Sequence, residues 1–285
     1  MTETTVDPDS GGTDENRDTA PCSEQHPDRF GRLVAVGIGP GRPDGMTIRA
    51  REALESAEHI VGYETYIDLL PADILDDTTE VFATGMGSEV SRTEVAVDRA
   101  MDGAAVALVG SGDPNVYALG GLVLEVLESR DVKPDAVDFE AVPGVPAAQS
   151  SAARLGAPLV NDAVTISLSD HLTTIEEIES RLRAVAPENF AIAIYNPWSP
   201  NRAENFQLAC EILLEHRTEE TPVGIVHGAG RADEATHITD LGELPKLGGS
   251  DILDMTATII VGTEETRVWG DRLITPRGYE RKYDY

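Results

Sequence analysis

Cysteine is nearly absent from this sequence. Cys22 and Cys210 are the only two among 285 residues, so the chain can build neither a disulfide framework nor a cluster of cysteine metal ligands. A composition of this kind is typical of proteins in a reducing compartment. We therefore predict no structural disulfide and no metal site.

Long apolar runs are missing as well. No stretch approaches the roughly 18 consecutive apolar residues that a membrane-spanning helix requires, so we expect a soluble protein with no membrane partner. The amino terminus has neither the basic start nor the apolar centre of a secretory signal, which favours a cytoplasmic location. Its polar, acidic composition predicts a disordered tail over residues 1–30.

Basic residues are few, and lysines are fewer still. The sequence has 22 Lys and Arg against 51 Asp and Glu, for a formal net charge of -29, and its lysines are Lys133, Lys246 and Lys282. Such a surface repels phosphates, which argues against nucleic acid as a partner. A high-salt cytoplasm would explain the charge, because a Debye length of about 3 Å at 1 M salt screens the repulsion between carboxylates. We therefore hypothesise a halophilic protein.

What the sequence does contain is a regular alternation of short β-rich runs and longer helical patterns. This alternation predicts an α/β fold with two sheets in two domains, residues 31–142 and residues 143–285. In the first domain we expect strands at 32–38, 59–63, 80–84, 104–110 and 137–142, and helices near 47–57, 64–70, 88–102 and 115–129.

The second half follows the same pattern up to its last strands. We expect helices near 146–155, 173–185 and 201–216, and strands at 163–169, 190–196, 222–228, 235–239 and 255–262. Only short polar turns separate the last strands, which leaves no room for crossover helices. That end of the second sheet is therefore predicted to be antiparallel.

Unusual loops follow four of the predicted strands. They read GIGPGRPDG from residue 37, SGDPNVY from 111, YNPWSPNR from 195 and HGAGR from 227. Open α/β sheets bind ligands beyond the carboxyl ends of their strands. The four loops therefore predict a ligand cleft between the two halves.

The GIGPG loop is similar to a dinucleotide fingerprint but departs from it. The third glycine of G-x-G-x-x-G is replaced by Arg42, and Pro40 and Pro43 stiffen a loop that should curl into a helix. Glu64, just past the second strand, keeps a nicotinamide cofactor open as an alternative, and a tight turn without a ligand is another. A Walker loop is excluded, since no lysine follows a glycine.

The SGDP loop has two interpretations. Asp113 makes a good N-cap and Pro114 suits the first position of a helix, so the loop could simply start a helix. A cap requires neither Ser111 nor Gly112, however, whereas two small residues at a strand end let a ligand lie against bare backbone. The same choice between turn and ligand contact applies to PGVPA, residues 143–147.

Titratable residues do not form an evident catalytic set. His227 at a strand end is more often hydrogen-bonded structure than a catalyst. Asp170 and His171 follow another strand, where a carboxylate can serve as a general base or merely cap a helix. A noncatalytic regulatory module therefore stays open beside the enzymatic hypotheses.

Taken in order, the motifs resemble the tetrapyrrole methylases. Over roughly residues 32–279 the shared features are VGIGPG with MTIRAREAL, SGDP, VPGV, IYNP and TPVGIV. Within the family, the chain is most similar to the ring-contracting methyltransferases that act on carbon 17 of a precorrin in cobalamin synthesis. The stretches VGYETYIDLL, SGDPNVYALGGLVLE, ISLSDHLT, IYNPWSPNR, TPVGIVHGAGR and TRVWGDRLITPRGY carry that likeness.

The resemblance implies S-adenosylmethionine as methyl donor, a tetrapyrrole substrate and a homodimer. Carried over by position, the donor contacts would be Pro40, Ser111, Gly112, Asp113, Val116, Pro146, Ala147, Asn196 and Ala229. Pro146 stands where the family commonly has threonine, and Asn196 where other branches often have methionine. The ring contraction also requires proton transfer, for which Asp170 is the candidate.

A precorrin carries many carboxylates, so an acidic protein must concentrate arginine where the substrate binds. Guanidinium groups bind carboxylates in pairs. The candidates are Arg42, Arg49, Arg92, Arg202, Arg231 and Arg277. The alternative is that they pair with nearby surface acids. Three other functions stay open: methylation at another ring position, action on a diphthamide intermediate, and a nicotinamide-dependent oxidoreductase.

Overall fold

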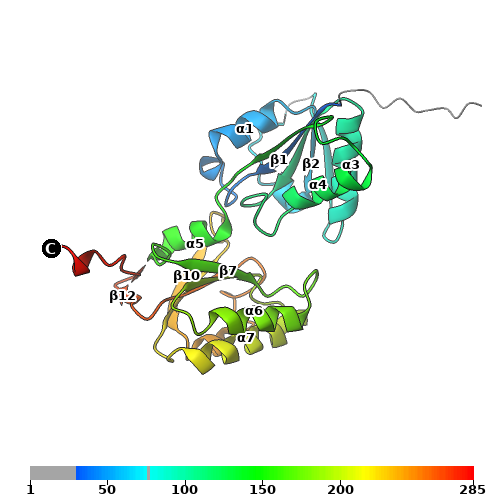
Figure 1. Cartoon of the computed structure of the whole chain (residues 1–285). Helices are drawn as coiled ribbons and strands as arrows, with labels where there is room; N and C mark the ends of the chain where they lie inside the picture. The colour runs from blue at the N-terminus through cyan, green and yellow to red at the C-terminus, as the bar shows by residue number, and fades with distance from the viewer. Residues whose placement is uncertain (1–29, 76–77) are drawn as a thin grey trace, which may run out of the picture.

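The computed structural model describes residues 30–75 and 78–285, and the tail predicted over residues 1–30 lies almost entirely outside this part of the chain. Two five-stranded sheets and a small three-stranded sheet make up the β structure. Helices cover both large sheets, which are stacked one above the other in Figure 1. The predicted α/β class is confirmed.

The first sheet is entirely parallel. Its strands run in the order β3-β2-β4-β1-β5. They are β1 (Arg32–Gly37), β2 (His59–Tyr63), β3 (Glu80–Thr84), β4 (Ala105–Gly110) and β5 (Asp138–Val142).

Helices cover both faces of this sheet, as the βαβ connections require. The four are α1 (Ile48–Glu55), α2 (Glu64–Ile67), α3 (Glu89–Met101) and α4 (Gly120–Ser129). Val34 and Val36 of β1 point to the core shared with α1. Leu33, the alternate residue, points to the core shared with α3 and α4. The carboxyl ends of all five strands therefore meet at one edge.

The second sheet has the order β10-β9-β11-β8-β7. Its strands are β7 (Ala163–Ser167), β8 (Ala191–Tyr195), β9 (Pro222–His227), β10 (Ala235–Asp240) and β11 (Thr258–Val261). β7 and β8 are parallel, whereas β11 pairs antiparallel with β8 and β9, and β10 pairs antiparallel with β9. The antiparallel end predicted from the short turns is confirmed.

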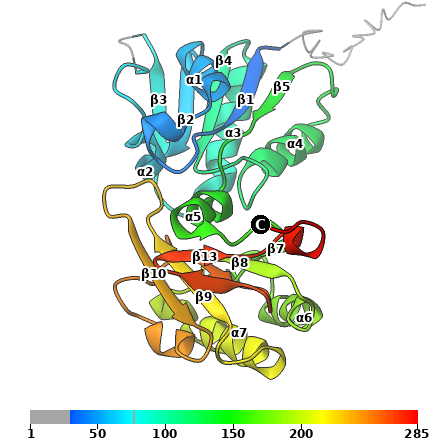
Figure 2. The ribbon, with the colours of Figure 1, turned by 90° about the vertical axis from the view of Figure 1, so that its left-hand side faces the viewer.

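Three helices belong to the second sheet. α6 (Ile175–Val185) and α7 (Ala203–His216) bury Ile178, Leu182 and Phe206 against one face, together with Cys210. α5 (Ala147–Leu155) packs Ala148 on the other face. Because α5 faces the first sheet, it lies between the two sheets (Figures 1 and 2).

The third sheet was not predicted. It joins β6 (Gly156–Ala157), β12 (Arg267–Trp269) and β13 (Arg272–Ile274). Strands of two or three residues are too short to show a period in the sequence. Four 3-10 turns complete the described structure: η1 (Pro43–Gly45), η2 (Pro200–Arg202), η3 (Leu244–Leu247) and η4 (Tyr279–Arg281).

Helix boundaries differ from the prediction at one important place. The helix expected from residue 115 begins only at Gly120, after a run of turns. By contrast, α1 begins where expected, because the Thr47 hydroxyl caps it by accepting the N–H of Ala50 at 3.1 Å. The loop after β4 is therefore longer than predicted, and its residues 115–119 do not belong to a helix.

The apolar cores lie on either side of residue 143. Within the described residues, the clusters around β1 to β5 use side chains up to Val142, and those around β7 to β11 begin at Ala148. This separation supports our proposal of two domains, residues 31–142 and 143–285. The helices of the described part are too short or too polar to cross a membrane.

Candidate functional site

The loops that follow β1 and β4 join through their backbones. Gly39 donates its N–H to the carbonyl of Gly112 at 3.2 Å, and Gly112 donates to the carbonyl of Gly39 at 2.8 Å. Both glycines have positive φ angles, 71° and 66°, a conformation that other residues adopt only with strain. The ends of two adjacent parallel strands are thereby held together.

The loop after β5 closes on the same point. A Cβ added to Gly37 would lie 2.5 Å from the Gly112 carbonyl oxygen and 2.8 Å from the Gly144 nitrogen. A Cβ on Gly144 would collide with the same Gly112 oxygen. We call Gly37, Gly39, Gly112 and Gly144 the glycine contact. It is a close packing of main chain against main chain, at the edge where α/β sheets bind ligands.

Beside the glycine contact there is open space. A Cβ placed on Gly110, the last residue of β4, would meet nothing within 4 Å. The next residue, Ser111, is half-buried. A small ligand can therefore approach the backbone at the end of β4.

Asp113 is not the N-cap of a helix. Its carboxylate oxygen Oδ1 accepts the N–H of Asn115 at 2.8 Å, and α4 begins later, at Gly120, with Leu119 as its N-cap. The capping interpretation is therefore wrong. Asp113 closes a local turn, in which Val116 also donates its N–H to the Asp113 carbonyl at 3.1 Å.

The start of α5 reaches the glycine contact from the second half of the chain. A Cβ on Gly112 would lie 3.4 Å from Cα of Pro146, the N-cap of α5, and 3.8 Å from the nitrogen of Ala147. In the first turn of α5, Ala148 donates its N–H to Tyr195 Oη at 2.9 Å. Tyr195 is the last residue of β8. A strand end of the second sheet is thus tied to the first.

Asn196 and Ala229 flank this arrangement from the second sheet. Asn196 has a φ of 49° and donates its side-chain N–H to Ser167 Oγ at 3.0 Å. Ala229 packs beside Val226 in the core under α5. Both are half-buried.

The connection between β9 and β10, residues 228–234, extends to the first sheet. In Figure 2 it rises toward α2. A Cβ on Gly230 would lie 2.7 Å from Pro40 Cβ, so the two loops are in direct contact. Glu234 fixes the loop, because its Oε2 accepts the N–H of Gly230 at 2.6 Å and Arg154 Nε at 2.8 Å. All nine residues predicted to contact the methyl donor thus lie in the loops that converge here or beside them.

Three of the six candidate arginines are engaged with the protein. Arg42 forms a two-pronged bond to Asp44, which raises the pKa of the guanidinium. Arg49 binds Glu140. Arg92 is 3% exposed, donates to Thr84 Oγ1 at 2.8 Å, and stacks over an aromatic ring.

The other three arginines have no carboxylate partner in the described part of the chain. Arg202 donates to Ser199 Oγ at 3.2 Å, and Arg277 to Asn161 Oδ1 at 3.3 Å. Arg231 lies in the β9–β10 connection, with its Cγ 3.5 Å from where a Gly41 Cβ would lie. Its stem thus reaches from the second sheet to the loop that contains Pro40.

The titratable residues named from the sequence occupy different surroundings. Asp170 is exposed in the loop between β7 and α6. His227 is held by Asp254, whose Oδ2 is 3.3 Å from Nε2, and by the Asp233 carbonyl at 3.3 Å from Nδ1. These contacts match the structural interpretation of His227. Glu64 is exposed at the start of α2.

Residues 32–245 match the family model described as Tetrapyrrole (Corrin/Porphyrin) Methylases. The chain belongs to this family. A 40% identical relative is the probable cobalt-factor III C(17)-methyltransferase of Salmonella typhimurium, aligned over 247 residues that cover 87% of this chain and 99% of the relative.

Two further relatives differ from it in length and in the substrate that their names state. The cobalt-factor III methyltransferase of Priestia megaterium is 42% identical over 89% of this chain, which spans 46% of that relative's length. The precorrin-3B C(17)-methyltransferase of Sinorhizobium is 37% identical over 87% of this chain and 97% of its own. These relatives give the nicotinamide-dependent alternative no support.

Solved methylase structures share the fold. The methyltransferase CobJ superposes with a TM-score of 0.79 at 32% identity, covering 86% of this chain and all of its own. A uroporphyrin-III C-methyltransferase of Thermus thermophilus, complexed with S-adenosylhomocysteine, has a TM-score of 0.62 at 22% identity and covers 81% of this chain and 97% of its own. The second likeness concerns the fold alone.

Sequence reasoning missed the tyrosines of this methylase. Tyr195 links α5 to β8, and burial raises its pKa. The ring of Tyr117 lies 5.1 Å from that of Tyr195 and is exposed, with an unusual φ of 50°. The quoted motifs SGDPNVY and IYNP contained both residues. A bulky residue with positive φ, however, is visible only in the structure.

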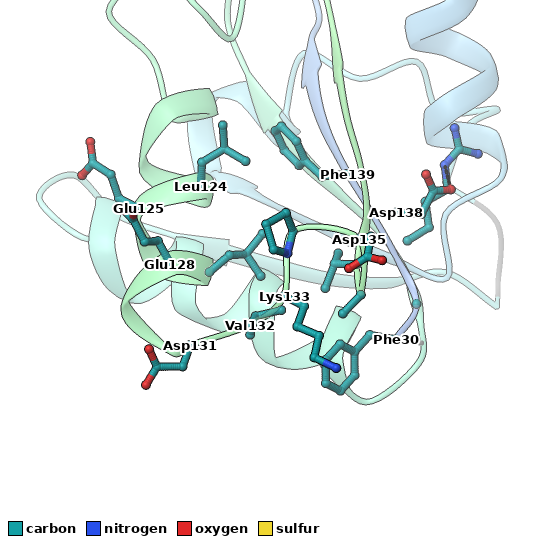
Figure 3. A pocket seen from close by; sticks show the side chains of 16 residues that line it. Phe30, Leu124, Glu125, Glu128, Asp131, Val132, Lys133, Asp135, Asp138 and Phe139 are labelled. Atoms are coloured by element: carbon teal, nitrogen blue, oxygen red, sulfur yellow. Dashed lines mark ion pairs between the residues drawn. The ribbon is translucent and has the colours of Figure 1, made fainter. Parts of the chain in front are cut away.

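A wide hollow in the described residues lies elsewhere. It measures about 1270 Å³ and is lined by the start of β5, the end of α4 and the loop between them. Figure 3 shows Leu124, Val132 and Phe139 around it, with a rim of acidic side chains: Glu125, Glu128, Asp131, Asp135 and Asp138. These are the amino ends of the parallel strands, and the five acids outnumber the two bases that line the hollow, Arg32 and Lys133, so on balance it disfavours carboxylates. We therefore do not assign the substrate to this hollow.

Proposed function

We propose that this methylase transfers a methyl group from S-adenosylmethionine to carbon 17 of a precorrin-type macrocycle, with contraction of the ring. The observation that carries the proposal is the 40% identity to a C(17)-methyltransferase that this chain covers over 99% of its length. The glycine contact adds physical support, since its backbone hydrogen bonds hold the loops after β1 and β4 together at the edge where this fold class binds ligands.

The residues present suit the methyl donor. The open space at Gly110 admits a ligand to the backbone of β4, and the Asp113 carboxylate accepts hydrogen bonds from hydroxyl or amino groups. We assign donor contacts to Pro40, Ser111, Gly112, Asp113, Val116, Pro146, Ala147, Asn196 and Ala229. When bound, the donor supplies an electrophilic methyl group on a sulfonium, and this transfer requires no metal ion.

The protein contributes chiefly by alignment. Holding two reactants in the right geometry lowers a barrier by up to roughly 7–11 kcal/mol in favourable cases. Loops fixed by backbone hydrogen bonds, such as those of Gly39 and Gly112, suit this role because they do not rearrange during the reaction. The exposed carboxylate of Asp170 is assigned to proton transfer during ring contraction.

Asp170→Asn tests that assignment. The variant keeps the size of the side chain and removes its ability to accept a proton at the reaction pH, so turnover should fall by about 10²–10⁴-fold. Donor binding, measured by calorimetry, should remain as in the unsubstituted protein. An unchanged turnover number would remove Asp170 from the mechanism.

The decisive experiment is incubation with labelled S-adenosylmethionine and the trimethylated macrocycle. The names of the relatives state both a cobalt-containing and a cobalt-free substrate. One arm of the experiment therefore contains cobalt and the other lacks it. Mass analysis should find one added methyl group, and NMR should place it on carbon 17. A methyl group at another carbon would assign the chain to another branch of the family, and no transfer in either arm would refute the proposal.

We further propose a cytoplasmic homodimer that works at high salt. The family resemblance suggests the homodimer, and the net charge of -29 supports function at high salt. Sedimentation in molar KCl should give twice the mass of 30.5 kDa. A monomer under these conditions would contradict the dimer.

A further inference from the structure

Arg231 differs from its neighbours in being unpaired. Acidic residues outnumber basic ones by 51 to 22 in this chain, so most arginines find a carboxylate. Arg42 binds Asp44 and Arg154 binds Glu234. Yet among residues 30–75 and 78–285 no carboxylate lies within the 4.0 Å ion-pair distance of the Arg231 guanidinium.

The acids nearest to Arg231 in sequence are committed elsewhere. Glu234 binds Arg154 and the N–H of Gly230 through one oxygen. The Asp233 carboxylate lies beside Gly228, and its Oδ2 is 3.9 Å from His227 Nδ1. The loop therefore contains two carboxylates that could have neutralised Arg231, and it turns both toward other partners.

The base of Arg231 is nevertheless held firmly. Its N–H donates to the carbonyl of Gly228 at 2.8 Å, and its carbonyl accepts the N–H of Glu234 at 3.2 Å. The side-chain stem passes Gly41, with Cγ 3.5 Å from where a Cβ of that glycine would lie. Arg231 is half-buried in the described chain. A fixed stem with an unpaired charge loses little conformational entropy when it binds an anion.

A half-buried phenol lies close enough to feel this charge. Tyr66 follows β2 in helix α2, and burial raises its pKa, an effect that the positive charge of Arg231 partly offsets. A neutral phenol does not neutralise a guanidinium. The residues of the first sheet that the structure places beside Arg231, namely Pro40, Gly41, Leu69 and Tyr66, are themselves uncharged.

We propose that Arg231 binds a carboxylate of a bound reactant beside Pro40. The inference rests on the proposed function, because that function supplies the carboxylates, on the rim of the macrocycle and on the methyl donor. Guanidinium and carboxylate form paired, charge-assisted hydrogen bonds. Arg231 belongs to the second sheet and Pro40 to the first, so a carboxylate held here is fixed where the two sheets meet.

The test compares Arg231→Gln and Arg231→Lys with Arg181→Gln, an exposed arginine paired with Glu177 on α6 as control. If the carboxylate belongs to the macrocycle, KM for the macrocycle should rise about tenfold to hundredfold in Arg231→Gln, with kcat changed much less. If it belongs to the donor, the Kd of S-adenosylmethionine should rise by that factor instead. Arg231→Lys should recover part of the loss, and Arg181→Gln should change neither constant.

Two further measurements separate this proposal from the proposed function. Binding of uroporphyrin, a tetrapyrrole with carboxylates on its rim, is followed by fluorescence and requires no turnover. An unsubstituted protein that binds uroporphyrin but converts neither precursor would refute the proposed function. Weaker uroporphyrin binding by Arg231→Gln would then still support the role of Arg231. If the unsubstituted protein is active and Arg231→Gln, folded with an unchanged free energy of unfolding, alters neither KM nor Kd, the role of Arg231 is refuted.

Discussion

Glycine at position 144 fixes how closely the ends of β4 and β5 approach. Any side chain there would meet the carbonyl oxygens of Gly112 and Gly37, and both belong to backbone held by the sheet. Gly121 in α4 is the opposite case, because a Cβ at that position meets nothing within 4 Å. Crowding by backbone therefore requires glycine at position 144, whereas a side chain at position 121 would have free space.

Gly144→Ala should therefore destabilise the protein, and Gly121→Ala should stabilise it. We expect a loss of at least about 1–3 kcal/mol for the first, as for overpacked sites. The second should gain about 0.5–1 kcal/mol, since alanine favours a helix. Denaturant titration measures both free energies of unfolding. Equal effects of the two substitutions would show that the glycine contact does not require bare backbone.

Tyr195 offers a second prediction for a single residue. In Tyr195→Phe the N–H of Ala148 loses its acceptor, which should cost about 1–3 kcal/mol of unfolding free energy. The matched control is Tyr285→Phe at a ring that is 93% exposed, where no change is expected. If Tyr195→Phe also left the free energy of unfolding unchanged, water would be serving as the acceptor in place of the hydroxyl.

Single residues were predictable from the sequence only where local chemistry decides their role. Thr47 caps α1 because its hydroxyl lies within one turn of Ala50. The cap considered as one interpretation of Asp113 did not form, because this carboxylate closes a turn with Asn115 before any helix begins. The hydrogen bond between Tyr195 and Ala148 joins residues far apart in the sequence, so no local sequence pattern predicts it.

At the scale of elements, β1, β5 and α1 are linked by charge. Glu140 of β5 accepts hydrogen bonds from Arg49 of α1 and Arg32 of β1. The bond from Arg49 is the largest cause of the lowered pKa of the Glu140 carboxyl, which is below the ordinary 4.5. A carboxyl with a lowered pKa stabilises the fold above its ordinary pKa, and that contribution is lost as the pH falls through the folded-state value.

Glu140→Gln should therefore weaken the protein at neutral pH and matter less in acid. The carboxyl is about a third exposed, so the difference should be on the order of 1 kcal/mol. It should shrink as the pH falls below 4.5. Unfolding titrations from neutral pH downward give the curve, with Glu52→Gln, a more exposed partner of Arg49, as the control expected near zero. A constant difference at all pH values would contradict the linkage.

Elements with a clear period were found from the sequence, and those without one were missed. The strands of both large sheets lie where alternating or continuous apolar runs placed them, and the antiparallel end followed from short turns. β6, β12 and β13 have two or three residues each and form only because α5 and β9 provide Leu155 and Gly224 for Leu273 to pack on. Tertiary contacts of this kind leave no local signal.

For the whole molecule, the net charge of -29 is the dominant electrostatic fact. Ion pairs such as Arg183 with Glu179 and Glu215 use the few bases available, and most carboxylates of residues 30–75 and 78–285 have no base beside them. Such a surplus repels itself in dilute buffer. Unfolding temperature should therefore rise as KCl increases from millimolar to molar concentrations, with scanning calorimetry as the measurement. Full stability in dilute buffer would contradict our halophilic hypothesis.

The glycine contact also restricts how this enzyme can diversify. The glycine contact consists of main chain, and larger side chains at Gly37 or Gly144 would collide with backbone. Substitutions there therefore cannot adjust the specificity of the enzyme. New preferences among ring carbons have to come from loops that do carry side chains, such as residues 168–173 and 228–234 on the second sheet. Substitutions that alter specificity are therefore expected first in these loops of the second sheet.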